Sequence, residues 1–133
     1  MAIYKSEVEI SQPVQEVYSF LNDLNNHQQL MPENVENWSS TKDTAKLNIK
    51  NLVKLELEVK QRVENELIKI TPINSLPFKM HLTWELEGLT AEKCRVVYTL
   101  NAELNMLMRN MAGGYLQPFV ETQTKKLKNN WMD

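Results

Sequence analysis

Few side chains in this sequence are suited to acid–base chemistry, and the two histidines come first among them. A histidine that acts as a general acid or base must reach the substrate and be oriented by a partner. His27 follows Asp23 by four residues, so a continuing helix would bring the two side chains together. The segment 22–29 is rich in Asn and Asp, however, and we expect His27 to lie in a solvated loop. His81 falls on the charged face of its segment, which predicts a surface position.

Two polar side chains could instead orient a bound molecule. Gln61 interrupts an apolar row between Val59 and Val63, and a buried amide without a partner costs about 1–3 kcal/mol. Gln61 could therefore hold a ligand carbonyl or hydroxyl, with the Tyr98 hydroxyl as a second anchor. In the alternative arrangement, which we expect, Gln61 lies past the edge of the core or at a bulge and meets water.

The sequence carries no further signature of catalysis or metal binding. Cys94 is the single cysteine, and it begins an apolar row that has no basic residue on the same face, so we expect it to be buried and unreactive. Two distant histidines do not form a metal-ligand cluster. No glycine-rich phosphate loop or serine elbow occurs. We therefore predict no catalytic residue, no metal and no cofactor.

Composition limits the remaining classes of function. The chain has 133 residues, and we expect residues 1–133 to form a single domain. The net charge of −2 provides no overall basic surface for nucleic acid. No apolar run is long enough to cross a bilayer, and the N-terminal residues do not resemble a signal peptide. We expect a cytoplasmic protein without an integral membrane segment or a nucleic-acid partner.

The elements that would position these residues follow from the period of the apolar side chains. Residues 4–10 alternate, which predicts a strand with one hydrated face. Pro13 favours the start of a helix, whose apolar stripe consists of Val14, Val17, Leu21 and Leu24. The Asn-rich segment should end this helix, and residues 30–32 could close a short second one.

A period of two then extends to residue 104. It predicts strands at 35–40, 45–51, 53–64 and 66–71, and two more on either side of a turn at 88–93. The strand 53–64 has the strongest pattern, with a dry face made of Val53, Leu55, Leu57, Val59 and Val63. From Met106 the period is helical, with a stripe of Leu107, Met111, Tyr115, Phe119, Leu127 and Trp131. Gly113, Gly114 and Pro118 should bend or divide this last helix.

This order predicts an α+β protein with a helix-grip fold. A curved antiparallel sheet of about six or seven strands would wrap around the long C-terminal helix, with one or two short helices after the first strand. The sheet needs a cover for its dry face, and the last helix has the only long apolar stripe available.

Several short motifs punctuate this order: Ser11-Gln12-Pro13, Val17-Tyr18, Phe20-Leu21, the polar break 23–26, Met31-Pro32, Pro77-Phe78 and Gly113-Gly114. With them the chain resembles, from Tyr4 to Trp131, the superfamily of START-related lipid-transfer domains, birch-pollen-allergen-like proteins and polyketide cyclases. Its bacterial members are the nearest in pattern. The chain lacks the glycine-rich loop of the plant members and the extra helices of full-length START domains. The resemblance implies a small hydrophobic ligand, or none.

We predict a cavity for a small hydrophobic molecule between the sheet and the last helix. Methionine side chains are flexible and suit apolar guests, and small-molecule sites are mostly apolar with a few polar anchors. The alternative is that the same side chains fill the core. The candidate lining residues are Trp38, Leu55, Leu57, Gln61, Trp84, Tyr98, Met108, Met111, Tyr115 and Phe119.

Three functions remain open at this point. The leading one is the binding or transport of a lipid, quinone or polyketide-like molecule. The second is a cyclase or dehydratase activity, with Tyr98, Gln61 and His27 as the residues that would move protons. The third is an interaction or co-chaperone-like protein with a filled core. The sequence leaves the oligomeric state open, a homodimer included.

Overall fold

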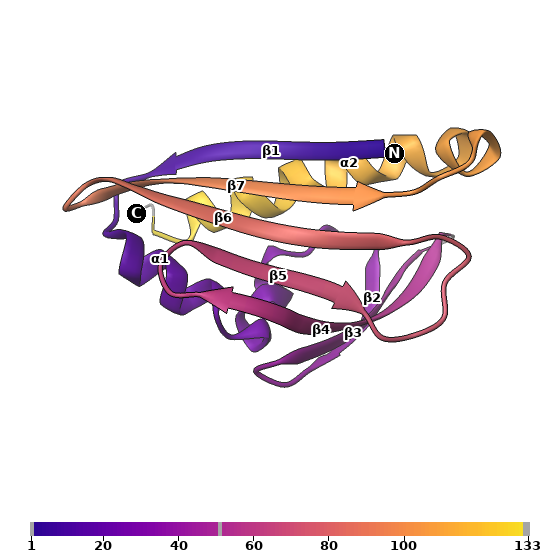
Figure 1. Cartoon of the computed structure of the whole chain (residues 1–133), viewed down its shortest axis with the longest axis horizontal. Coiled ribbons are helices and arrows are strands. Elements are labelled where there is room, and N and C mark those ends of the chain that lie inside the picture. Colours follow the sequence, from indigo (N-terminus) through magenta and orange to yellow (C-terminus); the bar gives the residue numbers. More distant parts are fainter. Residues whose placement is uncertain (1, 51, 132–133) are drawn as a thin grey trace.

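The computed structural model describes residues 2–50 and 52–131, and Figure 1 shows their arrangement. Its helices are α1 (Val14–Leu21), the 3-10 helix η1 (Leu24–Leu30) and α2 (Met106–Asn129). Its strands are β1 (Ala2–Ile10), β2 (Val35–Ser40), β3 (Thr44–Ile49), β4 (Val53–Val63), β5 (Leu67–Pro72), β6 (Met80–Thr90) and β7 (Lys93–Ala102).

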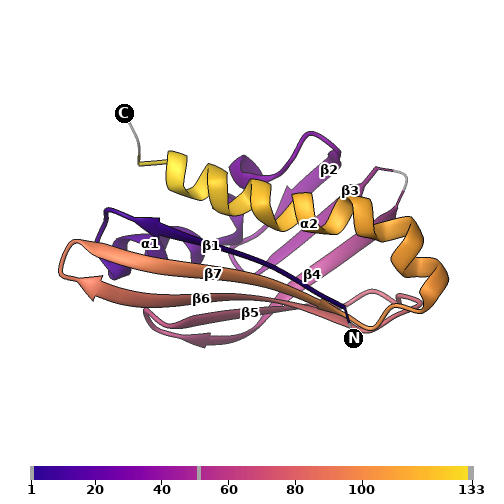
Figure 2. The ribbon, with the colours of Figure 1, turned by 90° about the horizontal axis from the view of Figure 1, so that it is seen from above.

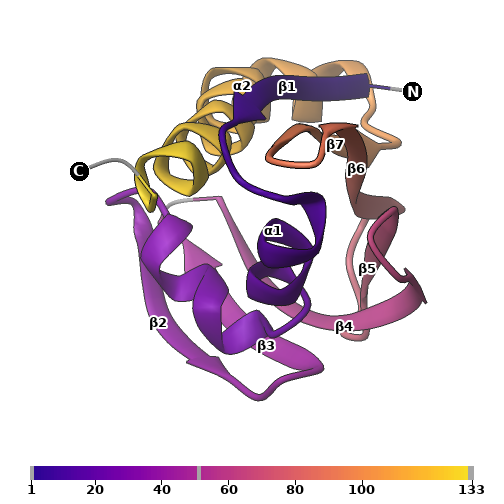
Figure 3. The same ribbon diagram turned by 90° about the vertical axis from the view of Figure 1, so that its left-hand side faces the viewer.

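The seven strands form one antiparallel sheet in the order β1-β7-β6-β5-β4-β3-β2. Every strand from β2 onward pairs with its successor in the sequence, and β1 joins the far edge against β7. The sheet curls, and α2 lies along its open side next to β1 (Figure 2). An end-on view shows α1 and η1 covering one end of the curl (Figure 3). The predicted α+β helix-grip fold is confirmed.

The inner face of β6 and β7 holds the largest buried side chains. On β6, Leu82 and Trp84 are buried, and on β7, Tyr98 and Leu100 are buried, as their alternation predicted. Cys94 is also buried at the start of β7, and burial raises the pKa of its thiol. This pKa shift keeps the thiol protonated and unreactive at neutral pH.

The inward face of β4 changes at a bulge. Val59 and Gln61 pair with consecutive residues of β5, so Lys60 is an extra residue in the ladder. One extra residue turns every later side chain to the opposite face. Val63 is consequently exposed, and its predicted place on the dry face is wrong.

The same bulge gives Arg62 a structural role. Arg62 pairs with Ile68, which is buried on the inner side of β5. Its guanidinium donates hydrogen bonds to Asn22 Oδ1 at 2.6 Å and to Asn22 O at 3.1 Å, and its Nη2 lies 2.7 Å from Asp43 Oδ1. Arg62 thereby joins the far end of β4 to the break after α1 and to the β2–β3 turn.

The first half of α2 buries a face different from the predicted one. Leu107, Met111 and Tyr115 are 67%, 59% and 40% exposed, so their predicted place in the buried stripe is wrong. Each step of four residues advances about 40° beyond a full turn, which puts Leu107 about 120° from Phe119 around the helix. The residues that α2 buries are Ala112, Leu116, Phe119, Val120, Gln123, Thr124 and Leu127.

The helix α2 is continuous and bent. Pro118 lies inside it and has no N–H to donate to the carbonyl of Gly114 four residues earlier. Figure 2 shows the ribbon changing direction between its orange first turns and its yellow remainder. We expected Pro118 and the paired glycines either to bend the helix or to divide it, and the structure shows a bend.

Candidate ligand cavity

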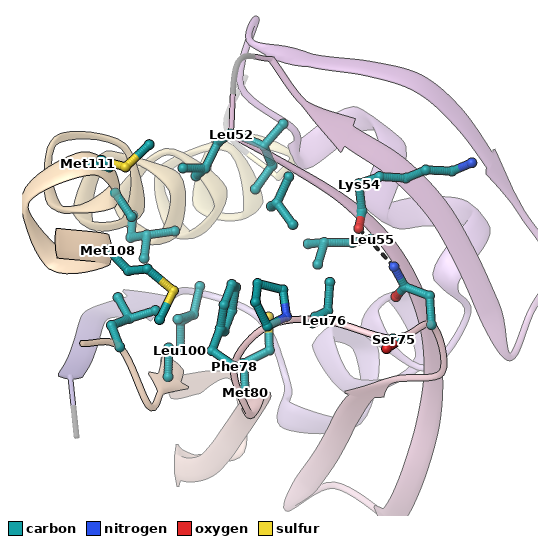
Figure 4. Close-up of a pocket in the computed structure, with 18 residues that line it drawn as sticks. Leu52, Lys54, Leu55, Ser75, Leu76, Phe78, Met80, Leu100, Met108 and Met111 are labelled. Atoms are coloured by element: carbon teal, nitrogen blue, oxygen red, sulfur yellow. Dashed lines mark hydrogen bonds between the residues drawn. The ribbon is translucent and has the colours of Figure 1, made fainter. Parts of the chain in front are cut away.

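A cavity of about 590 Å³ lies between the first half of α2 and the sheet (Figure 4). Known small-molecule sites range from about 300 to 1,000 Å³, so its size suits a small ligand. The lining comes from four parts of the chain: α2, the β3–β4 hairpin, the loop 73–79, and the adjoining ends of β6 and β7. Side chains that point into it include Leu55, Phe78, Leu100 and Met108.

The wall of this cavity is almost entirely apolar. The aliphatic stem of Lys54 leads its ammonium group away from the interior (Figure 4). Asn74 lies in the lining, but its amide is already occupied: Nδ2 donates to Lys54 O at 2.9 Å, and Oδ1 accepts from Glu56 N at 3.0 Å. Asn74 thus continues the hydrogen bonding of β4 after Pro72 ends β5, and it fixes the loop at the rim of the cavity.

A buried aromatic and polar cluster lies deeper in the same interior. The ring of Tyr98 stacks on Trp84 at a centroid distance of 3.8 Å, and His27 meets the edge of Trp84 at 5.9 Å. A second cavity of about 20 Å³ adjoins this cluster, and His27, Tyr98 and Gln123 are its polar lining residues.

His27 is buried, and the prediction that it lies in a solvated loop is wrong. A 3-10 helix has three residues per turn, so Leu24, His27 and Leu30 share the inward face of η1. The imidazole Nε2–H donates to Leu21 O at 2.8 Å. Burial lowers the pKa of His27 to about 4, while this hydrogen bond and the charge of Asp23 act in the opposite direction. The ring is therefore neutral at pH 7.

The other two members of the cluster are Tyr98 and Gln123. Burial raises the pKa of the Tyr98 hydroxyl, and hydrogen bonding with the Gln123 side chain opposes the rise. Gln123 is fully buried on α2, where its Nε2 donates to Phe119 O at 3.3 Å. Gln123 was not among the predicted site residues, although it falls between Val120 and Leu127 on the buried face of the helix.

Comparison with known proteins adds the family. Residues 10–128 match the family model described as polyketide cyclase / dehydrase and lipid transport. The chain belongs to this family. The predicted resemblance to START-related and polyketide cyclase proteins is thereby confirmed.

Solved structures similar to this family member include the protein XoxI from Bacillus cereus (TM-score 0.78, 14% identity, 100% of this chain and 97% of that one). A START superfamily protein from Mycobacterium smegmatis has a TM-score of 0.69 and 14% identity over 96% and 95% of the two chains. A norcoclaurine synthase mutant from Thalictrum flavum, in complex with a transition-state analogue, has a TM-score of 0.74 and 8% identity over 97% and 92%. At these identities the likeness shows the fold. No curated protein matches the sequence.

The candidate lining residues separate into three groups. Leu55, Met108 and Met111 line the large cavity. Trp38, Leu57, Tyr98 and Phe119 line the small one, and Trp84 packs behind Tyr98. Gln61 is exposed at the bulge of β4, and Tyr115 is exposed on α2; neither lines the large or the small cavity described above.

The loop 73–79 and the inward residues Leu100, Ala112 and Leu116 complete the large cavity, and the sequence analysis did not single them out. Pro77-Phe78 was the feature of the sequence that could have indicated the loop.

Across residues 2–50 and 52–131, no helix combines the length and the apolar character needed to cross a membrane.

Proposed function

We propose that this protein binds a small, uncharged hydrophobic molecule in the cavity of about 590 Å³ beneath the first half of α2. The observation that carries the proposal is the cavity itself. Protein interiors are close-packed and hold few voids larger than a water molecule. This cavity is partly open to solvent, and an apolar ligand that filled it would remove its apolar surface from water.

The lining favours a lipid, quinone or polyketide-like molecule over a charged one. Burying an ion away from water costs far more than burying an apolar group, unless an opposite charge pairs with it. Among the described residues of the lining, Lys54 alone is charged, and it directs its ammonium group away. Met80, Met108 and Met111 provide flexible, polarisable walls that can adapt to the shape of the guest.

A cyclase or dehydratase activity has less support. Of the three residues that would move protons, none lines the large cavity. His27 uses its N–H on a backbone carbonyl, burial raises the pKa of the Tyr98 hydroxyl, and Gln61 is exposed. A function through a filled core and an outer surface fits poorly with a cavity of this size.

Binding of the neutral dye N-phenyl-1-naphthylamine tests the proposal. The wild-type protein should bind it saturably, at about one dye per chain. Ala112→Trp places an indole inside the cavity and should weaken binding by tenfold or more, on the order of 1.4 kcal/mol. Ala91→Trp is the matched control, because Ala91 is exposed in the β6–β7 turn, and it should bind like the wild type. A folded wild-type protein that binds no dye would contradict the proposal, as would unchanged binding by Ala112→Trp.

A further inference from the structure

Two buried polar atoms lack hydrogen-bond partners within the described part of the chain: Gln123 Oε1 and Trp84 Nε1. The orientation of the Gln123 amide is fixed by Phe119 O, which can only accept a hydrogen bond and therefore faces Nε2. If the amide were rotated by 180°, Gln123 Oε1 would face Phe119 O, and both of these atoms are acceptors. Gln123 Oε1 is thus a buried hydrogen-bond acceptor without a donor among the described residues. Leaving such an atom unpaired lowers the stability of the folded state.

The space beside Gln123 admits one small group. The cavity there measures about 20 Å³, enough for a single water molecule or hydroxyl. The residues of 2–50 and 52–131 that line it include no Lys, Arg, Asp or Glu, and His27 is neutral at pH 7. An anion would be desolvated without a counter-charge, and a carbonyl could not donate to Gln123 Oε1. An uncharged hydroxyl satisfies both conditions, since it can donate to Gln123 and accept from the Tyr98 hydroxyl.

This small space lies directly behind the large cavity. On four strands, the residue that lines the large cavity and the residue that lines the small one are successive inward positions. Two residues along a strand span about 6–7 Å, so a single layer of side chains separates the two spaces. The pairs are Ile49 and Leu47, Leu55 and Leu57, Met80 and Leu82, and Leu100 and Tyr98.

We propose that Gln123 Oε1 accepts a hydrogen bond from the hydroxyl group of an uncharged amphipathic ligand whose apolar body lies in the large cavity. This inference rests on the proposed function and names the ligand class: an apolar alcohol that enters hydroxyl first. The layer of side chains between the two spaces moves apart to admit the head. Trp84 stacks behind Tyr98 and holds the phenol ring in place beside the hydroxyl.

Farnesol and farnesyl fluoride test this assignment, because they share one apolar body and the fluorine is close to a hydroxyl in size but cannot donate a hydrogen bond. We expect the wild-type protein to bind farnesol about tenfold more tightly than the fluoride. Gln123→Leu removes the acceptor at nearly constant size and should bind both molecules equally. Gln117→Leu makes the same change on the outer side of α2, where Gln117 is bonded to Lys5 O, and should keep the preference.

Each outcome separates the anchor from the cavity. Equal binding of farnesol and farnesyl fluoride by the wild type would overturn the hydroxyl anchor and leave cavity binding in place. Binding of neither molecule would overturn the proposed function as well. A preference that persists in Gln123→Leu would also overturn the anchor. Should Gln123→Leu fail to fold, the side-chain amide resonances of Gln123 in the wild type decide, since farnesol should shift them clearly more than farnesyl fluoride does.

Discussion

His27 should make this protein less stable in acid, by an amount that follows from its burial. Burial lowers the pKa of the folded-state imidazole from 6.5 to about 4. In the unfolded chain the ring is hydrated, so between pH 6.5 and pH 4 the unfolded state binds a proton that the folded state does not. The free energy of unfolding therefore decreases as the pH falls through this window, by about 1.4 kcal/mol per pH unit and about 3 kcal/mol in all. Above this window His27 contributes no pH dependence.

Urea unfolding of the wild type and of His27→Gln across this window measures the effect. Glutamine keeps an N–H for the carbonyl of Leu21 and does not titrate, so its stability should change less with pH. Carboxylates titrate in both proteins, and the difference between the two therefore isolates His27. His81→Gln is the matched control: burial also lowers the pKa of His81, but this side chain is only partly buried, so the variant should change the pH dependence less than His27→Gln does. Equal pH dependence of wild type and His27→Gln would refute the reasoning.

Two further predictions concern the bulge of β4 and the rim of the cavity. Arg62→Met should lower the free energy of unfolding by about 1 kcal/mol in urea titrations, because it breaks partly exposed bonds to Asn22 and Asp43, while Lys60→Met should have little effect. Asn74→Ala should speed ligand dissociation in stopped-flow measurements and cost about 1–2 kcal/mol of stability, since the loop loses both bonds to β4. Ser75→Ala is its control, and equal dissociation rates for the two variants would contradict the role of Asn74.

The fold was predictable because its sheet is dry on one side. Alternation locates β2 at Val35–Ser40 and β4 from Val53 onward, as the structure has them. Alternation does not reveal where a ladder gains a residue. The polar side chain of Gln61 was the one sign near the bulge, and it led to the expectation of a hydrated or bulged position, where Gln61 lies.

The inward faces of the helices were harder to predict than those of the strands, because the number of residues per turn was not known in advance. A stripe with strict spacing of four drifts around an α-helix, which is why Leu107 and Met111 are exposed whereas Phe119 and Leu127 are buried. In η1 the tighter 3-10 period turns His27 inward, and a period of 3.6 cannot show this.

The position of the cavity depends on whether side chains on opposite walls touch each other. Neither the strand period nor the helix period in the sequence predicts the distance between those walls. Leu100 and Leu116 have the pattern of ordinary core residues, and they are buried, yet they line an open space. Gln123 could have been found, because a polar residue within a buried stripe needs a partner. The sequence therefore predicts which kind of residue lines the cavity, but not where in the fold the cavity lies.

The cavity exists because the two halves of α2 pack differently. The second half is fastened to its surroundings: Thr124 is hydrogen-bonded to Ser6 of β1 at 2.6 Å, Lys126 Nζ donates to Met31 O at 2.7 Å, and Trp131 beyond the helix packs edge-on against Phe20. The first half instead covers the large cavity on one side, and Met106, Leu107 and Met111 in it are exposed.

Between these halves lie Gly113, Gly114 and Pro118, which weaken the helix at the point where it leaves the packed core. A Cβ added at either glycine would meet no atom within 4 Å, so close packing does not account for them. Their effect is on the helix itself, through its backbone. Moving the first half outward would expose Ala112 and Leu116, whereas moving the second half outward would expose the larger set of Phe119, Val120 and Leu127. The first half of α2 is therefore held to the core less firmly than the second half.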